Sequence, residues 1–448
     1  MGENQKISVI IPVHNSAAML KQCLAAVASS DFTKYECIVV DDSSADNSTE
    51  VAREYGARVI ELKGGPYGPA FARNRGVEAA EGEFVYFIDS DVVIMPDTLS
   101  KVAQSFEDFP EYDALFGSYD ESPGDGQFLS IYKNLSHHYV HQQANREGHT
   151  FWTGCGAIRR DVFLELGGFN TQRYPRPSIE DIELGVRLRV AGHRILVNKD
   201  IQVKHLKRWT LLNLLKTDVL DRAIPWTLLI LHERNLPNDL NLNQSQRLSA
   251  LLLVVMLIDL GLSAFFVNNI ILLPLLSMLF LAVVSSWQLY EGLTLFRMGR
   301  KAELLTYSVI ISIFVLAFYL KHRDLFPPLG LLLLVMIAGK FLPVNSIVLR
   351  HILFGVVVIS LLIGFVLLFI SYPLWTVLPV LLIVFLIFWM NRHYYIFFAR
   401  IRGPIFALAV LPFQLLYYLY SIIAFGAGYS IHLAGEWLKQ RTKPEKQV

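Results

Sequence analysis

EFVYFIDSD, residues 83–91, decides the fold that we expect for this chain, because it has the pattern of a buried strand ending in two carboxylates. Side chains of an extended strand alternate between its two faces, so Asp89 and Asp91 are expected to project together from its end. Two anions held this close favour a bound cation. The stretch therefore predicts a strand that carries a binding site at its carboxyl end.

Three similar strand patterns precede this one, and helical patterns separate them. Apolar runs rich in β-branched residues occupy 7–13, 35–42 and 57–62, and helical periodicity occupies 16–30, 48–56 and 68–82. Four strand–helix units predict an α/β fold with a mostly parallel, doubly wound sheet, whose ligand site lies at the carboxyl ends of the strands. Asp41 and Asp42 follow the second strand, so both acidic pairs are expected at this edge.

The chemistry of these acids is open at the level of the residues. Asp42 is suited to accept hydrogen bonds from a base or ribose, and Asp89 and Asp91 to bind a ribose and a divalent metal. The alternative is that they are ordinary loop and cap acids, since two Asp separated by one residue form a weak pattern. No G-x-G-x-x-G opens the first helix and no P-loop motif occurs, which disfavours dinucleotide-binding domains and P-loop NTPases.

Composition divides the chain into a globular part and an apolar part. The 448 residues are 53% hydrophobic, and long apolar stretches dominate from Leu248 onward. We expect a globular domain over 1–208, amphipathic interfacial helices over 209–247, a transmembrane domain over 248–430 and a basic tail over 431–448. The net charge of +1 disfavours a nucleic-acid partner. Three cysteines without metal-ligand spacing are expected to be free thiols.

The apolar part is predicted to cross a membrane six or seven times. The tract 248–289 is twice the roughly 20 residues that one helix needs, and it is interrupted at 267–269, so it is expected to form a hairpin. Further candidate spans are 304–320, 327–345, 351–371, 373–390 and 404–428. Basic clusters at 297–301 and 391–402 favour the side of the globular domain, whereas 321–323 disagrees, so the side of the C-terminus stays open.

Several motifs together resemble family 2 glycosyltransferases, which are inverting enzymes of the GT-A fold. The motifs are IIPVHN (10–15), VVDDSSADNS (39–48), ARNRG (72–76), FIDSD (87–91), GCGAIRRDVFLELGGFN (154–170) and IEDIELGVRLRVAG (179–192). The resemblance implies a nucleotide-diphospho-sugar donor, with Asp42 near the base, Asp89 near the ribose and Asp91 on a Mg or Mn ion that bridges the diphosphate. It also implies that Arg73 faces the phosphates or the base. The donor residues expected on this basis are Pro12, Val13, Asn15, Asp42, Arg73, Asp89 and Asp91.

The acceptor side is expected from the second half of the globular domain. Residues 151–160 have the pattern of a strand whose glycines allow a substrate to approach, followed by a helix that Gly167 and Gly168 end. Ser178 and Asp181 match a capping box, so Asp181 is either a helix cap or, as the resemblance implies, the general base. If the acceptor is a phosphate, Asp181 would position it instead. The residues expected on this side are Trp152, Gly154, Cys155, Gly156 and Glu180.

The stretch VKHLKRW, residues 203–209, bears on processivity. Processive synthases of the resembled family carry Gln-x-x-Arg-Trp near this place, whereas this chain has His205 at the Gln position. The resemblance to single-addition members implies that His205 reaches the metal or the diphosphate; the alternative is a surface histidine. Arg208 and Trp209 are interpreted as the start of the interfacial segment.

These expectations combine into a membrane-embedded inverting glycosyltransferase. The resemblance implies a nucleotide-diphospho-sugar donor, and the apolar domain with its interfacial helices favours a membrane lipid or lipid-linked acceptor. We expect the transfer at the cytosolic face of a bacterial or archaeal plasma membrane. Asp259, in the first expected span, is either functional or hydrogen-bonded between helices. The alternatives are a processive synthase that extrudes a polysaccharide, and a non-catalytic sugar-binding or transport protein. Neither the sugar, the nucleotide nor the acceptor follows from the sequence.

Overall fold

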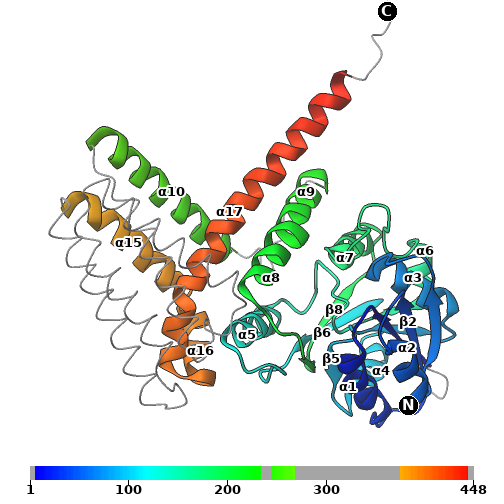
Figure 1. Ribbon diagram of the computed structural model, residues 1–448. Coiled ribbons are helices and arrows are strands. Elements are labelled where there is room, and N and C mark those ends of the chain that lie inside the picture. Colours follow the sequence, from blue (N-terminus) through cyan, green and yellow to red (C-terminus); the bar gives the residue numbers. More distant parts are fainter. Residues whose placement is uncertain (1–5, 234–243, 268–373, 442–448) are drawn as a thin grey trace, which may run out of the picture. The chain divides into compact units, whose positions relative to one another are not determined.

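The computed structural model describes residues 6–233, 244–267 and 374–441, and it divides into two units (Figure 1). The first unit comprises residues 1–243 with 423–448, and the second comprises residues 244–422. Each is described by itself. The first unit contains the predicted α/β domain, and the second contains the apolar helices.

The first unit is built on a sheet with the strand order β3-β2-β1-β4-β7-β6-β8-β5. The strands are β1 (Ile7–Val13), β2 (Tyr35–Asp42), β3 (Arg58–Leu62), β4 (Phe84–Phe87), β5 (Val92–Ile94), β6 (Ala114–Tyr119), β7 (Gly156–Arg159) and β8 (Ile195–His205). The helices are α1 (Ala17–Ala28), α2 (Ser48–Glu54), α3 (Pro69–Ala79), α4 (Thr98–Asp108), α5 (Phe128–Gln143), α6 (Arg160–Glu165), α7 (Glu180–Val190), α8 (Leu211–Lys216), the π-helix η1 (Thr217–Ala223) and α9 (Ile224–Glu233).

The sheet is mixed, so the prediction of a mostly parallel sheet holds for its first half. β1 pairs in parallel with β2 and β4, and β2 pairs in parallel with β3, as the strand–helix alternation predicts. β7 runs antiparallel to both β4 and β6, and β5 runs antiparallel to β8. In the antiparallel pair of β4 with β7, Gly156 lies opposite Phe87, so β7 begins where β4 ends. The residues before β7 are thereby placed at the carboxyl end of β4.

Alternation along the central strands fills two separate cores. Ile7, Val9 and Ile11 of β1 pack into one cluster with buried residues of α1, α2 and α4, whereas Ile10 packs into the other. The second cluster takes its helical residues from α3, α6 and α7. Helices therefore cover both faces of the sheet, as expected for strands that are apolar on both sides.

The fourth strand ends earlier than the pattern of residues 83–91 predicts. β4 stops at Phe87, and the amide of Val92 donates to the carbonyl of Asp89 at 3.0 Å. Asp89 and Asp91 therefore lie in a tight turn between β4 and β5, and strand alternation does not direct their side chains. The predicted helix end at Gly167 and Gly168 is confirmed, since both adopt positive φ angles (75° and 68°) after α6. The three cysteines are free.

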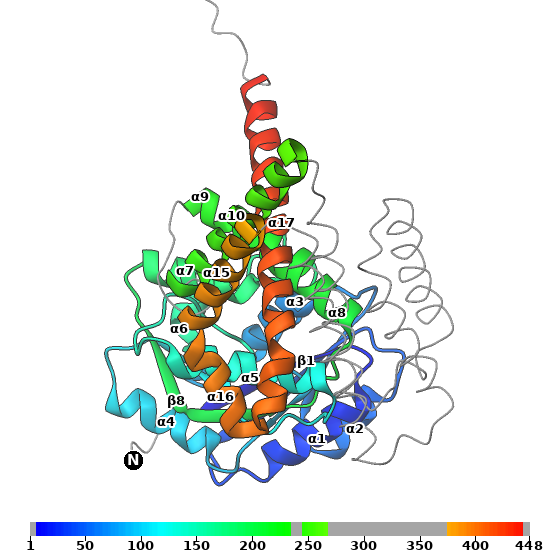
Figure 2. The ribbon, with the colours of Figure 1, turned by 90° about the vertical axis from the view of Figure 1, so that its left-hand side faces the viewer.

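The second unit contains packed apolar helices. These are α10 (Gln244–Val267), α15 (Leu374–Met390), α16 (Arg392–Arg402) and the first part of α17 (Pro404–Arg441). Leu253 of α10, Ile387 of α15 and Tyr418 of α17 belong to one buried cluster, and Figure 2 shows these helices beside one another. The amide of Asn391 donates to Ser249 Oγ at 2.8 Å, and the Tyr418 hydroxyl donates to Gln246 Oε1 at 2.8 Å. Such bonds satisfy polar groups between apolar helices.

Two described helices are long and apolar enough to cross a membrane, or three if one bent pair counts as a single span. They contain the windows Gln244–Gly261 and Pro404–Gly435, and the bent pair is Leu378–Met390 with Arg392–Arg402. Helices are therefore present where spans are predicted at 373–390 and 404–428, although α17 continues to Arg441. The spans at 304–320, 327–345 and 351–371, and the second half of 248–289, lie outside the described residues. So do the basic clusters at 297–301 and 321–323.

Asp259 lies in α10, as predicted for the first span. One oxygen of its half-buried carboxylate, Oδ2, has no hydrogen-bond partner among the described residues. The interhelical hydrogen bond considered from the sequence is thus not formed at this oxygen, and a functional role for Asp259 stays a prediction.

A substitution at Gly185 tests how α7 packs against the backbone of Thr150 and Phe151. A Cβ at this position would lie 2.2 Å from the amide nitrogen of Phe151 and 2.5 Å from the carbonyl carbon of Thr150. Because backbone cannot swing aside, we expect Gly185→Ala to destabilise the first unit by about 1–3 kcal/mol. The melting temperature of the purified chain should then fall by about 2–4 °C for each kcal/mol of lost stability. Gly126→Ala is the matched control, because a Cβ there has nothing within 4 Å. Equal melting temperatures for the two variants would contradict this packing.

Candidate active site

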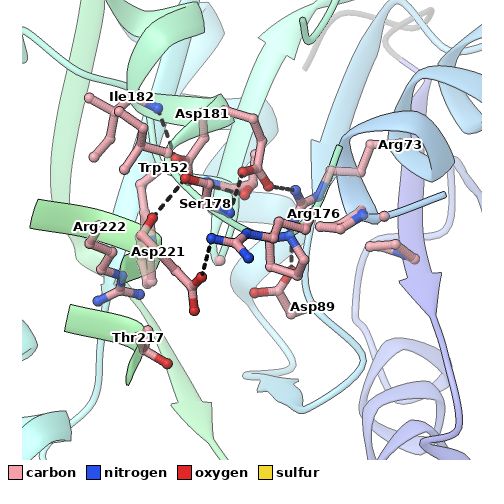
Figure 3. Close-up of a pocket in the computed structure, with 18 of the residues that line it drawn as sticks. Arg73, Asp89, Trp152, Arg176, Ser178, Asp181, Ile182, Thr217, Asp221 and Arg222 are labelled. Carbon is pink, nitrogen blue, oxygen red and sulfur yellow. Dashed lines mark hydrogen bonds and ion pairs between the residues drawn. The ribbon is translucent and has the colours of Figure 1, made fainter. Parts of the chain in front are cut away.

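A pocket of about 560 Å³ lies at the carboxyl ends of β1, β2 and β4 (Figure 3). It takes residues from the β4–β5 turn, from the loop before β7, from the start of α7 and from η1. Among the residues predicted from the sequence, those that line it are Pro12, Val13, Asp42, Arg73, Asp89, Asp91, Trp152, Gly154, Glu180 and Asp181. One pocket thus collects residues from most of the predicted motifs.

Asp91 and His205 are brought together by the pairing of β5 with β8. Val92 lies opposite His205 in this antiparallel pair, and the amide of Leu206 donates to the Asp91 carbonyl at 2.8 Å. As a result His205 Nε2 lies 3.5 Å from Asp91 Oδ2. The His205 ring is buried and stacks on Tyr119, with ring centroids 4.3 Å apart. His205 is therefore not a surface histidine.

The Asp91–His205 pair offers two side chains of the kinds that bind metal ions, a carboxylate and an imidazole. Burial alone would raise the pKa of the Asp91 carboxyl, but His205 and Lys207 more than offset it and hold that pKa below its usual value. Within the described residues no group of three His, Cys, Asp or Glu side chains is close enough to hold a metal ion. One carboxylate and one imidazole nevertheless fit an ion such as Mg or Mn that takes its remaining ligands from phosphate oxygens and water.

Arg73 joins the β4–β5 turn to the start of α7. Its Nη2 donates to Asp89 Oδ1 at 2.6 Å and its Nη1 donates to Glu180 Oε1 at 2.9 Å (Figure 3). The Arg73 side chain is only 4% exposed, so its two terminal nitrogens are committed to these carboxylates. From the sequence we expect Arg73 to face the phosphates or the base. The structure places it in the pocket wall, where it holds two acids.

The charges of this buried group influence one another. Burial raises the pKa of the Glu180 carboxyl, and Arg73 offsets this in part. Burial acts in the same direction on the pKa of Asp89, whose side chain still opens into the pocket with 38% of its surface exposed. Burial lowers the pKa of the Arg73 guanidinium, but Asp89 and then Glu180 raise it, and together the carboxylates outweigh burial. The guanidinium therefore stays charged. Without Arg73, the carboxylates of Asp89 and Glu180 would have no cation between them.

Asp181 opens into the pocket and does not form the capping box considered from the sequence. α7 has Ile179 at its N-cap, and the Ser178 hydroxyl donates to the Asp221 carbonyl at 2.7 Å. Asp181 Oδ1 accepts from the Ile182 amide at 2.8 Å, and Oδ2 accepts from the Thr153 amide and hydroxyl at 3.1 and 3.2 Å. A carboxylate has about four acceptor sites. The three donors therefore fix its orientation and leave it able to accept one more hydrogen bond.

The donor-side residues divide into pocket lining and support. Asp42 accepts from the amides of Tyr67 and Gly68 at 2.8 and 2.7 Å, so both oxygens hold the loop before α3. Asn15 does not line the pocket: its Oδ1 accepts from the Ala45 amide, and its Nδ2 lies 2.9 Å from the ring Nε2 of His14. His14 does line the pocket and was not predicted, although it directly follows Val13 in the same motif.

The acceptor-side glycines make room for a tryptophan. A Cβ at Gly154 would lie 2.4 Å from the Trp152 ring, and one at Gly156 would lie 2.3 Å from the Trp152 carbonyl oxygen. The close approach expected of a substrate is therefore made by Trp152, whose ring also contacts Tyr119 and His141. Cys155 and Gly156 are not among the lining residues. The Cys155 thiol is buried against the Tyr86 hydroxyl, and burial raises its pKa to about 12.

The wall formed by η1 was not predicted from the sequence. Thr217, Asp221 and Arg222 of this π-helix line the pocket, together with Trp226 of α9 (Figure 3). Arg176 lies 3.6 Å from the Asp221 carboxylate, and Arg222 Nη1 donates to His137 Nε2 at 3.1 Å. The sequence signal for this wall lies in the charged residues of the amphipathic stretch 209–242. By its pattern, that stretch predicts a membrane interface and not part of a pocket. A π-helix is rare and is frequent at functional sites, but its shifted spacing escapes helical periodicity.

Comparison with known proteins identifies the first part of the chain. Residues 8–167 match the profile of Glycosyl transferase family 2. The poly(ribitol-phosphate) beta-N-acetylglucosaminyltransferase TarS of Staphylococcus aureus is 37% identical over 137 residues, which cover 29% of this chain and 24% of TarS. The poly(ribitol-phosphate) beta-glucosyltransferase of Bacillus spizizenii is 33% identical over 138 residues, 29% of this chain and 22% of that protein. The chain thus spans about a quarter of the length of these two relatives.

Solved structures of glycosyltransferases are similar only at a low level. The S. aureus TarS fragment 1–349 in complex with UDP-GlcNAc shows 24% identity and a TM-score of 0.38, and the match covers 46% of this chain and 60% of that one. A Pyrobaculum calidifontis mannosyltransferase in complex with GDP-Man and Mn²⁺ shows 21% identity and a TM-score of 0.39, covering 51% and 62%. The sequence match over 8–167 contains the strands β1 to β4 and the β4–β5 turn, whose residues line part of the pocket. In sequence, residues 8–167 of this chain therefore match glycosyl transferase family 2, and they contribute to a mixed sheet.

Proposed function

We propose that this chain is an inverting glycosyltransferase that moves a sugar from a nucleotide-diphospho-sugar to an acceptor carried by a membrane lipid. The observation that carries the proposal is that Asp181 lies in one pocket with Asp91, which is paired to His205. These groups meet the two needs of the reaction: a base for the acceptor and charge neutralisation for the leaving group.

The transfer is a single displacement at the anomeric carbon. The acceptor oxygen forms the new bond to this carbon while the bond from the carbon to the diphosphate oxygen breaks. Asp181 takes the proton of the acceptor hydroxyl, and the nucleoside diphosphate leaves with the bonding electron pair. Asp181 is suited to this step because it lines the pocket with one acceptor site remaining, while the Thr153 and Ile182 donors fix the carboxylate.

Asp91 and His205 would hold a divalent cation, Mg or Mn, which supplies positive charge to the diphosphate. The fit rests on the donor set: a carboxylate oxygen and an imidazole nitrogen 3.5 Å apart at the pocket edge. Asp89 would accept from the ribose hydroxyls, because one side of its carboxylate is exposed while Arg73 holds the other. Asp42 would meet the base beside Pro12 and Val13.

The proposed acceptor class is supported by the wall that η1 and α9 form. η1 and α9 fall in the stretch predicted to lie at a membrane interface, and Asp221, Arg222 and Trp226 of these helices line the pocket. A pocket with such a wall would receive the head of a lipid, and α10 and α17 are long and apolar enough to anchor the chain in a bilayer. We propose a bacterial or archaeal plasma membrane as the location, with the pocket on the cytosolic side; the apolar helices support the membrane part of this proposal.

The relatives suggest a second acceptor chemistry. Both named relatives act, by their names, on poly(ribitol-phosphate), a polymer that presents hydroxyl groups. A hydroxyl acceptor requires the base, whereas a phosphate acceptor is already ionised at neutral pH and does not. The behaviour of Asp181 variants therefore separates these two classes.

Asp91→Asn tests the cation site. We expect this change to weaken the Mn²⁺-dependent binding of UDP or GDP and to lower sugar transfer by about 10²-fold or more, since it removes the anionic ligand. Calorimetric titration with and without EDTA measures the binding, and nucleotide release measures the transfer. Asp113→Asn is the matched control, because Asp113 also pairs with a histidine, His193 at 2.9 Å, but does not line the pocket. Wild-type transfer that EDTA leaves unchanged would refute the cation.

Asp181→Asn tests the base and the acceptor class together. With a hydroxyl acceptor we expect kcat to fall by about 10²–10⁴-fold with little change in donor binding. With a phosphate acceptor we expect kcat to change by less than about ten-fold. Asp161→Asn is the control: Asp161 accepts from the next amide at 2.8 Å in the first turn of α6, as Asp181 does in α7, but it is exposed outside the pocket. A comparable loss of transfer in both variants would mean that Asp181 acts through helix stability.

A further inference from the structure

A second, smaller cavity of about 70 Å³ adjoins the Asp91–His205 pair. It lies between α5, the end of β8 and η1, and its basic side chains are Lys133, Lys207 and Arg222. Its volume exceeds what a single water molecule needs. Asp89, Asp91 and His205 of the sequence motifs line this cavity, but no motif assigns a role to its cations, which come from three separate elements.

Asp89 and Asp91 also line the cavity, but Asp89 is paired with Arg73, so Lys207 and Arg222 outnumber the one remaining carboxylate. Lys133 Nζ contacts both oxygens of Asp218 at 2.6 and 2.7 Å, so this pair is close to neutral. Arg222 contacts the ring nitrogen of His137, and burial followed by Arg222 itself lowers the pKa of His137 well below its usual value. A neutral ring can accept from the guanidinium without cancelling its charge. Within the described chain the Lys207 ammonium forms no ion pair and lies 4.4 Å from the centre of the Trp209 ring.

Two buried polar atoms of the cavity residues lack hydrogen-bond partners in the described part of the chain. These are the indole nitrogen of Trp209 and the side-chain oxygen of Asn134. Both residues are at least nine-tenths buried. A buried donor without a partner costs free energy, and a ligand with acceptor oxygens removes that cost. The indole N–H therefore adds a donor to the two cations.

The neighbouring Arg208 does not share this position. It belongs to neither set of lining residues, and its Nε donates to Gln127 Oε1 at 2.7 Å on the exposed side of the chain. The Arg-Trp pair noted in the sequence is thus divided: Trp209 enters the small cavity and Arg208 points away from it. Arg222 from η1, which no motif marks, lines the cavity instead.

We propose that Lys207, Arg222 and the Trp209 indole form a subsite for a phosphoryl group next to the Asp91–His205 pair. Phosphoryl oxygens are strong acceptors, and guanidinium and ammonium groups are their usual partners. The group is either the terminal phosphate of the leaving nucleoside diphosphate or a phosphate carried by the lipid acceptor. The inference rests on the proposed function, and it names the chemistry that this part of the site recognises.

The test compares phosphate-containing ligands on the full-length chain in detergent. Lys207→Gln and Arg222→Gln each remove one cation, Trp209→Phe removes the indole N–H, and Arg208→Gln is the control. Calorimetry with Mn²⁺ measures the affinity for pyrophosphate, for UDP and GDP, and for UMP and GMP. Polyprenyl phosphate and the corresponding polyprenol, in mixed micelles, form the lipid arm.

We expect the Lys207 and Arg222 variants to bind pyrophosphate at least about ten-fold more weakly, with a smaller loss for Trp209→Phe and no change for Arg208→Gln. If the donor supplies the phosphoryl group, the diphosphates lose affinity and the monophosphates do not. If the acceptor supplies it, polyprenyl phosphate loses affinity while the nucleotides and polyprenol do not. Binding of every ligand within two-fold of wild type in both cation variants would overturn the subsite.

This outcome is distinguishable from failure of the proposed function. Pyrophosphate and polyprenyl phosphate report on the subsite even if no nucleotide-sugar is turned over. Conversely, the wild-type chain could transfer no sugar while the Arg222 variant still loses pyrophosphate binding. That result would support the subsite and refute the proposed transferase activity.

Discussion

The ion pairs of Arg73 are the interaction on which the pocket depends. One guanidinium holds Asp89, from the turn after β4, and Glu180, from the first turn of α7. Asp91 and Asp181, which carry the proposed chemistry, are two residues and one residue away from these partners. Removing one partner of a buried ion pair costs about 3–5 kcal/mol, because the other charge is left without compensation. The Arg73 guanidinium thus holds the β4–β5 turn against the start of α7.

Pairing between distant segments completes the site. The antiparallel contact of β5 with β8 sets His205 beside Asp91, and the reversal at β7 sets Trp152 at the end of β4. α5 and η1 are joined by two contacts with matched spacing: Lys133 with Asp218, and His137 with Arg222, each pair one helical turn from the other. These contacts hold the η1 side chains in the pocket, so the segment predicted to lie at a membrane interface becomes part of the site.

Glycine has a different role here from the one expected in a substrate-facing strand. At Gly154 and Gly156 the missing side chains are replaced by Trp152, and at Gly185 by the backbone of Thr150 and Phe151. Close packing of chain against chain therefore orders the acceptor side before any ligand binds. Such preorganisation favours catalysis, because the groups need not be rearranged when the reaction occurs.

The sequence by itself determined what depends on local pattern. The parallel half of the sheet follows from apolar runs separated by helical periodicity, and the placement of Asp42, Asp89 and Asp91 follows from strands whose carboxyl ends meet at one edge. The helix ends at Gly167 and Gly168 follow from their freedom to adopt positive φ. Only the tertiary structure decided the contacts between residues far apart in the chain: the two partners of Arg73, the Asp91–His205 pair, and the η1 wall with its small cavity. Their spacing in sequence carries no regular period, because the pairing of strands and the packing of helices bring them together.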